Sequence, residues 1–133
     1  MFNKLTPNLM VEDVAQTIAF YTEVLGFEVL ATNPATTPFE WAMLGSGGVT
    51  IMFQSRFSFG QEFPALATAP IGASLSFYTE VSGIRALYEQ LKERVEIVKE
   101  LHTSFYGTLE FAFRDCNGYV LALSEQAEQT AQT

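Results

Sequence analysis

The strongest constraint on the fold of this chain is an internal repeat with a constant offset of 70 residues. Two stripes of apolar residues at helical spacing show it most clearly. They are Val14, Ile18, Tyr21 and Leu25 in the first half, and Ile84, Tyr88, Leu91 and Val95 in the second. Strand-like positions keep the offset in the pairs Val11 and Val81, Trp41 and Phe111, Met43 and Phe113, Ile51 and Leu121, and Phe53 and Leu123. Nine apolar pairs at one offset indicate that one structural module occurs twice.

Each module is predicted to contain a strand, a helix and then three strands. Module one covers 4–55, with strands near 4–11, 27–32, 38–44 and 48–55 and a helix near 13–25. Module two covers 73–125, with strands near 73–81, 96–102, 107–114 and 118–125 and a helix near 82–94. A linker at 56–72 joins them, and a tail at 126–133 is expected to be disordered. A chain of 133 residues is expected to form one α+β domain, 1–133.

Alternation along the strands separates two faces of each predicted sheet. Odd positions carry large apolar residues, Trp41, Met43 and Phe53 among them, and are predicted to form the core under the helices. Even positions are mostly small or polar and are predicted to face solvent or line a wet cavity. They are Thr6, Asn8, Met10, Glu40, Ala42, Thr50, Met52 and Gln54, then Ser76, Tyr78, Glu80, Glu110, Ala112, Val120, Ala122 and Ser124.

Composition excludes several classes of protein. Fifteen acidic residues against seven Lys and Arg give a net charge of -8, which argues against nucleic acids and anionic membrane surfaces as partners. No apolar run approaches the roughly 18 residues of a membrane span, and the first residues do not resemble a signal peptide, so a cytoplasmic location is expected. Cys116 is the only cysteine and His102 the only histidine, which excludes an internal disulfide and a Cys/His zinc site.

Several segments resemble the vicinal oxygen chelate superfamily, which includes glyoxalase I, extradiol dioxygenases, and fosfomycin and bleomycin resistance proteins. They are 11–14 (VEDV), 18–21 (IAFY) and 24–27 (VLGF), which resemble the family's opening, and 113–118 (FRDCNG), which resembles its closing hairpin with Cys116 in place of the usual proline. The resemblance covers about 4 to 125. It implies two βαβββ units whose mixed sheets curl around a central cleft, commonly within a homodimer.

The resemblance also identifies where metal-using members of the superfamily hold their ion. Two ligands come from the first strands of the modules, and others come from the last strands. Carried over to this chain, these positions hold Thr6, Ser76, Met52 and Ala122. None of these side chains supplies an imidazole or a carboxylate to a divalent ion. We therefore expect no metal and no other cofactor, and we predict no catalytic residue.

The resemblance then implies a metal-independent protein that binds a small organic molecule, similar to the bleomycin resistance proteins. Those proteins sequester a cationic drug in an aromatic-lined groove without altering it, which associates this chain with antibiotic resistance. Glu40 and Glu110 favour a cationic or planar ligand, because a carboxylate in a cleft needs water or a cation beside it. The candidate ligand-binding residues are Glu40, Met52, Gln54, Phe57, Phe59, Tyr78, Tyr106 and Glu110.

Alternatives remain open for both the residues and the function. Glu40 and Glu110 could be solvated or salt-bridged carboxylates, and the phenylalanines of the linker could form a lid or anchor the linker to the core. His102 is expected to be a surface or hydrogen-bonded histidine, since nothing near it in sequence supports a general-base role. An alternative function is a metal-dependent enzyme of the same superfamily, a glyoxalase-type lyase or isomerase or a dioxygenase, with atypical ligands. A third is an interaction module with a protein partner.

Overall fold

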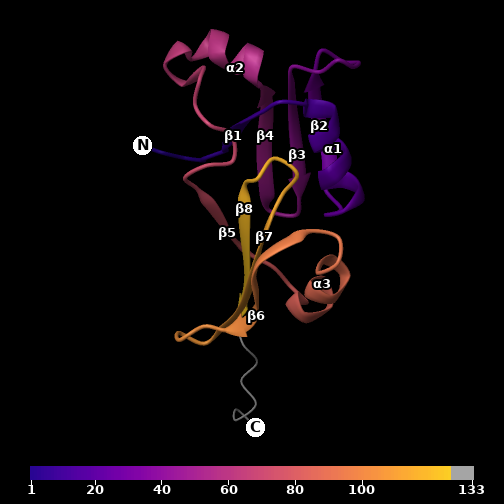
Figure 1. The fold of residues 1–133 in the computed structure, drawn as a ribbon, viewed down its shortest axis with the longest axis vertical. Helices are drawn as coiled ribbons and strands as arrows, with labels where there is room; N and C mark the ends of the chain where they lie inside the picture. The colour runs from indigo at the N-terminus through magenta and orange to yellow at the C-terminus, as the bar shows by residue number, and fades with distance from the viewer. Residues whose placement is uncertain (127–133) are drawn as a thin grey trace. The chain divides into compact units, whose positions relative to one another are not determined.

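The computed structural model describes residues 1–126, so 127–133 of the predicted tail at 126–133 lie outside the described residues (Figure 1). The chain divides into two compact units, with the boundary between Ile71 and Gly72. Each unit holds one four-stranded sheet, so the prediction of an α+β fold built from two βαβββ modules is confirmed. None of the described helices has the length and hydropathy needed to cross a membrane.

The first unit contains the predicted module and two further helical segments. Its elements are β1 (Asn8–Val11), α1 (Val14–Glu23), β2 (Glu28–Asn33), β3 (Trp41–Ser46), β4 (Val49–Ser55), α2 (Arg56–Glu62) and the 3-10 helix η1 (Pro64–Leu66). The sheet order is β1-β4-β3-β2, with β1 parallel to β4 and the other pairs antiparallel. The predicted linker therefore begins with a helix, which continues directly from the end of β4 (Figure 1).

The second unit repeats this topology. Its elements are β5 (Ser76–Glu80), α3 (Ile84–Leu91), β6 (Glu96–Thr103), β7 (Thr108–Arg114) and β8 (Val120–Gln126). The sheet order is β5-β8-β7-β6, again with only the first pair parallel. Gln126, which the sequence placed in the tail, is the last residue of β8.

One helix covers one face of each sheet. In the first unit α1 begins at the N-cap Asp13, whose carboxylate accepts a hydrogen bond from the backbone N–H of Gln16 at 3.0 Å. The helix buries Tyr21 completely, with its ring 4.9 Å from that of Phe53 on β4. In the second unit the ring of Tyr88 on α3 lies 5.0 Å from that of Phe111 on β7. Phe53 and Phe111 therefore mark the helix-covered face of their sheets.

The cap of α3 comes from a distant strand. Its N-cap residue is Gly83, with a φ of 71°, a left-handed conformation that glycine adopts without steric cost. The carboxylate of Glu125 on β8 accepts hydrogen bonds from the backbone N–H of Ile84 at 2.9 Å and of Gly83 at 3.1 Å. These bonds lower the pKa of Glu125 and join the helix to the sheet.

Strand register corrects the predicted faces of β3. Ala42 lies opposite Phe53, so it belongs to the helix-covered face, where it is fully buried. Trp41 lies opposite Gln54 and Met43 opposite Met52, so both belong to the other face. The prediction that Trp41 and Met43 are core residues and that Ala42 faces outward is therefore wrong.

Glu40 lies outside the strand whose faces are corrected. This residue lies at an exposed bend just before β3, and its backbone N–H donates to the carbonyl of Asn33. Since Glu40 lies before β3 and not within it, strand pairing does not assign its side chain to either face of the sheet, and its place in a ligand site stays a prediction.

The cause of the shift is the length of one hairpin. Two residues, Gly47 and Gly48, connect β3 to β4, since Ser46 pairs with Val49. The connection between β7 and β8 has five residues, from 115 to 119, since Arg114 pairs with Val120. The difference moves β3 by one residue relative to the repeat, and a shift of one residue moves each side chain to the other face.

Candidate functional site

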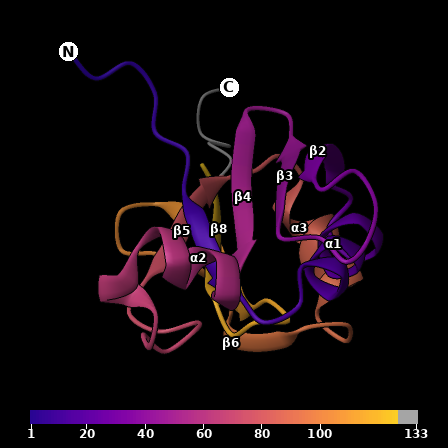
Figure 2. The same ribbon diagram turned by 90° about the horizontal axis from the view of Figure 1, so that it is seen from above.

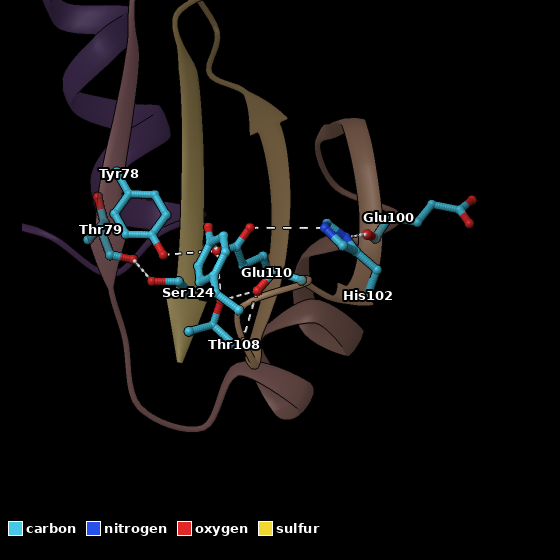
Figure 3. Close-up of polar contacts among 9 residues, drawn as sticks. Tyr78, Thr79, Glu100, His102, Thr108, Glu110 and Ser124 are labelled. Atoms are coloured by element: carbon cyan, nitrogen blue, oxygen red, sulfur yellow. Dashed lines mark hydrogen bonds and ion pairs between the residues drawn. The ribbon is translucent and has the colours of Figure 1, made fainter. Parts of the chain in front are cut away.

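We call the face of each sheet that its module's helix does not cover the open face. The open face of the second sheet carries a polar cluster centred on Glu110 of β7 (Figure 3). Tyr78 on β5 and Ala112 on β7 both pair with Ala122 on β8, and Glu110 pairs with Ser124 two residues further along β8. These residues therefore share one face, opposite to the one that α3 covers, as the sequence predicts. Only 16% of the Glu110 side chain is exposed. A carboxylate this well enclosed needs hydrogen-bond partners.

One oxygen of Glu110 accepts three hydrogen bonds from hydroxyl groups. Oε2 receives the phenol of Tyr106 at 2.5 Å, the hydroxyl of Thr108 at 2.8 Å and the phenol of Tyr78 at 2.9 Å. Thr108 is itself held by Ser104, whose Oγ lies 2.8 Å from the Thr108 hydroxyl and accepts the Thr108 backbone N–H at 3.0 Å. Three donors from β5, β7 and the β6–β7 loop thus fix the orientation of one carboxylate.

The hydrogen bonds determine the charge of the cluster. The bond from Tyr106 is the largest cause that lowers the pKa of Glu110, and the bonds from Thr108 and Tyr78 act in the same direction, against the effect of burial. The same contact with Glu110 raises the pKa of Tyr106 to about 12. At neutral pH the cluster therefore contains an ionised Glu110 and a protonated Tyr106.

The other oxygen of Glu110 is free of hydrogen bonds within the described part of the chain. Its neighbour is His102 on β6, which pairs with Glu110 across the β6–β7 ladder. His102 Nε2 lies 4.0 Å from Glu110 Oε1, beyond hydrogen-bond distance, and the two side chains point toward one another in Figure 3. His102 Nδ1 lies 2.7 Å from the carbonyl oxygen of Glu100.

Exposed aromatic rings surround this carboxylate. Tyr78 is 57% exposed and Tyr106 is 53% exposed, although both phenols donate to Glu110. Phe105, 99% exposed, packs edge-to-face on Tyr106 with the ring centroids 4.8 Å apart. A negatively charged oxygen beside accessible aromatic faces is a combination that suits organic cations.

The open face of the first sheet carries an amide network. Gln54 on β4 is buried, and its Oε1 accepts a hydrogen bond from Asn8 Nδ2 on β1 at 2.7 Å. Gln54 Nε2 donates to Ser58 Oγ at 2.8 Å and to Glu62 Oε1 at 3.2 Å, both on α2. In Figure 2, α2 lies on the other side of β4 from α1. Asn8 Oδ1 is buried and accepts no hydrogen bond from residues 1–126.

The linker aromatics divide into packed and exposed residues. Phe59 is buried, and its ring lies 5.5 Å from that of Phe63. Phe57 is 73% exposed and lines an open hollow of about 510 Å³ with Arg56, Gly60 and other residues of the first unit. Arg56 is held there by Glu12 at 3.0 Å and by two backbone carbonyls, those of Ala67 and Ala69.

The structure therefore gathers some of the predicted site residues and separates others. Tyr78, Tyr106 and Glu110 form one cluster in the second unit, while Met52 and Gln54 lie on the open face of the first sheet. The sequence did not predict His102 or Thr108 as members of the Glu110 cluster. Thr108 is two residues before Glu110, which is the spacing of side chains on one strand face and could have indicated it.

Comparison with protein-family models decides the family. The model described as Glyoxalase/Bleomycin resistance protein/Dioxygenase superfamily matches residues 3–123. The chain belongs to this superfamily. A comparison with curated proteins finds no match.

Solved structures support the superfamily fold. The chain is similar to TioX from Micromonospora sp. ML1, with a TM-score of 0.73 and 18% identity over 94% of this chain and 99% of that one. It is similar to a glyoxalase/bleomycin resistance protein/dioxygenase from Nocardioides, with a TM-score of 0.77 and 19% identity over 96% and 86% of the two chains. UcmS2 gives a TM-score of 0.70 and 26% identity over 93% and 98%.

The residues at the superfamily's metal positions do not fit a divalent ion. Met52 offers a thioether, Ala122 offers no donor atom, and Thr6 and Ser76 offer neutral hydroxyls. Within residues 1–126, no group of three His, Cys, Asp or Glu side chains lies close enough together to hold a metal ion. Ala122 pairs with Ala112, and Glu110 lies two residues before Ala112 on β7. Glu110 already accepts hydrogen bonds from three hydroxyl groups.

Proposed function

We propose that this superfamily member is a metal-independent binding protein for an organic cation, with a function similar to that of the bleomycin resistance proteins. The observation that carries the proposal is that the two carboxylate oxygens of Glu110 differ in their hydrogen bonding. Glu110 Oε2 accepts three hydroxyl donors, while Glu110 Oε1 accepts no hydrogen bond from the described residues. The side chain is thus held in place with one oxygen available to a ligand.

The chemistry around Glu110 favours a positively charged ligand that carries a ring. The hydrogen bonds that lower the pKa of Glu110 keep it negatively charged at neutral pH. A cationic group can bind Oε1 through a charge-assisted hydrogen bond, and the exposed faces of Tyr78 and Tyr106 can contact a planar group or the cation itself. The net charge of -8 also attracts cations over long range.

The same features favour binding over acid–base catalysis. A general base works best when its pKa lies near the operating pH. The pKa of Glu110 is shifted in the opposite direction, below its ordinary value, so this carboxylate is a weak base that retains its charge. Binding of a cation uses that charge directly, which supports a binding protein rather than the enzyme alternative.

A titration with matched probes tests the proposal. Phenethylammonium and its neutral isostere 2-phenylethanol are titrated into the full chain at pH 7.5, and binding is followed by calorimetry or NMR. We expect the cation to bind more tightly, and we expect Glu110→Gln to weaken its binding by roughly 10- to 100-fold, since a hydrogen bond to a charged group contributes about 1.5–3 kcal/mol.

The matched control is Glu93→Gln, which removes one negative charge from an exposed position that follows α3 in the same unit. This variant should leave the affinity unchanged. Equal binding of the alcohol and the ammonium, or equal loss of affinity in the two variants, would overturn the proposal.

A further inference from the structure

The hydrogen bond at His102 Nδ1 determines which ring nitrogen carries the proton. The Glu100 carbonyl oxygen, 2.7 Å from Nδ1, can only accept a hydrogen bond, so Nδ1 is the donor. In the neutral ring the proton is therefore on Nδ1, and Nε2 carries a lone pair. That lone pair belongs to the nitrogen that lies 4.0 Å from Glu110 Oε1.

Two hydrogen-bond acceptors thus face one another across 4.0 Å without a donor between them. The hydroxyls of Tyr78, Tyr106 and Thr108 are committed to Glu110 Oε2 and do not fill the gap. A nitrogen placed beside the pair can lie about 2.9 Å from both acceptors, which is an ordinary hydrogen-bond length. It needs two N–H bonds to donate to both.

We propose that Glu110 Oε1 and His102 Nε2 together form a two-acceptor site for a protonated primary amine. This inference rests on the proposed function and specifies the ligand's cationic group. A primary ammonium can donate one N–H to the carboxylate and a second to the imidazole. A quaternary ammonium has no N–H and retains only the charge attraction and the aromatic contacts. The site therefore discriminates between two cations of equal charge.

The same geometry makes amine binding dependent on pH. Protonation of His102 converts Nε2 from an acceptor into a donor, which can then pair with Glu110 Oε1 and close the site. The strand next to β6 is β7, and its Glu110 lies opposite His102. Tyr106 and Tyr78 reach the same carboxylate from the β6–β7 loop and from β5, while Lys99 and Glu100 are exposed on β6 itself.

The sign of the pH effect follows from which form of His102 binds. The second hydrogen bond of the primary amine needs neutral His102, so its affinity decreases when acidification protonates His102. The quaternary analogue donates no hydrogen bond to Nε2 and lacks this term.

The tautomer can be measured directly because His102 is the only histidine in the chain. Long-range ¹H–¹⁵N NMR of the uniformly labelled protein at pH 8 distinguishes a protonated ring nitrogen from an unprotonated one. We expect Nδ1 to be protonated and Nε2 to be unprotonated. A proton on Nε2 would fill the gap with a donor from the protein itself and would overturn the inference.

Selectivity provides the second test. Phenethylammonium and trimethyl(phenethyl)ammonium are titrated into the wild-type chain and into His102→Phe at pH 7.5 and 5.5. The wild type should prefer the primary amine at pH 7.5, and this preference should decrease by about three- to tenfold at pH 5.5, as expected for the loss of the one hydrogen bond to His102. His102→Phe, which keeps a ring at a partly exposed position, should show the same reduced preference at both pH values, since only the hydrogen bond to Glu110 remains.

The outcomes separate this inference from the proposed function. If the preference for the primary amine is the same in the wild type and in His102→Phe, and binding of the primary amine depends on Glu110, the proposed function stands and the two-acceptor site is wrong. If neither cation binds, both proposals are overturned. If His102→Phe fails to fold, the wild-type selectivity at the two pH values and the tautomer measurement still decide the inference.

Discussion

Trp41 and Glu110 occupy equivalent positions in the two sheets. Trp41 pairs with Asn33 on β2 and Gln54 on β4, and Glu110 pairs with His102 on β6 and Ser124 on β8. Both lie on the face that the module's helix leaves open. The same backbone position thus presents an indole in one module and a charged carboxylate in the other, so the duplicated scaffold carries two chemically different faces.

The position of Trp41 predicts a modest cost for its removal. Phe53→Ala empties a fully buried position under α1, and we expect it to lower the free energy of unfolding by about 3–5 kcal/mol. Trp41 is only partly buried on the open face, so Trp41→Ala should cost about 1–2 kcal/mol. Urea unfolding of the two variants measures both values. Equal losses would instead place Trp41 in the core under α1.

The topology could be predicted from sequence because the repeat and the helical stripes are local patterns with one offset. The faces of β3 could not, because the face of a strand depends on the length of its hairpin. The repeat aligns Trp41 with Phe111, whereas strand pairing aligns Trp41 with Glu110. The connection between β3 and β4 has two residues and that between β7 and β8 has five. The constant offset of the helices gives no indication of this difference in hairpin length.

The contact between His102 and Glu110 could not be predicted from the alternation of residues along the strands, for a related reason. The β6–β7 ladder contains two irregularities, one between Ile97 and Lys99 and one between Lys99 and His102. Each shifts the register by one residue, and together they bring His102 opposite Glu110. Bulges of this kind depend on how the whole sheet packs, so the sequence indicated Glu110, Tyr78 and Tyr106 without indicating the histidine beside them.

The amide network of the first unit predicts a pH-dependent defect. Gln54 Nε2 donates a hydrogen bond to Glu62 Oε1 at 3.2 Å. Gln54→Glu would replace this amide with a second carboxylate at about the same distance from Glu62. Repulsion and burial would raise the pKa of this pair in the folded state. A carboxylate with a raised folded pKa destabilises the protein as the pH rises, so the variant should be near wild-type stability at pH 4 and clearly less stable at pH 7.

Urea unfolding at the two pH values tests this prediction. Gln54→Glu combined with Glu62→Gln is the matched control, because it removes the second charge and should recover much of the stability at pH 7. A loss of stability that is the same at pH 4 and pH 7 would contradict the electrostatic explanation and indicate a packing defect.

Glu110 should contribute to stability above its titration range and lose that contribution in acid. Its pKa is lowered in the folded state from an ordinary 4.5, mainly by the Tyr106 hydrogen bond. The sign follows from linkage: the stabilisation is present above pH 4.5 and disappears as the pH falls through the lower folded pKa. The free energy of unfolding between pH 6 and pH 3 should therefore decrease more steeply in the wild type than in Glu110→Gln. Parallel curves would contradict this assignment.

Tyr106 should ionise well above the ordinary range of a tyrosine. Its hydrogen bond to Glu110 raises its pKa from 10.0 to about 12, because ionisation would place a phenolate beside a carboxylate. A raised folded pKa means that the contact stabilises the fold below pH 10 and that this stabilisation is lost as the pH rises toward 12.

Absorbance at 295 nm follows phenolate formation during an alkaline titration. We expect Tyr106→Phe to remove one phenolate step near pH 12 from the titration curve. Glu110→Gln should retain all five tyrosines but move that step back toward 10, since the neutral amide no longer opposes the phenolate. If the absorbance change near pH 12 has the same amplitude in Tyr106→Phe as in the wild type, Tyr106 does not ionise there, and the contact between Tyr106 and Glu110 does not hold in solution.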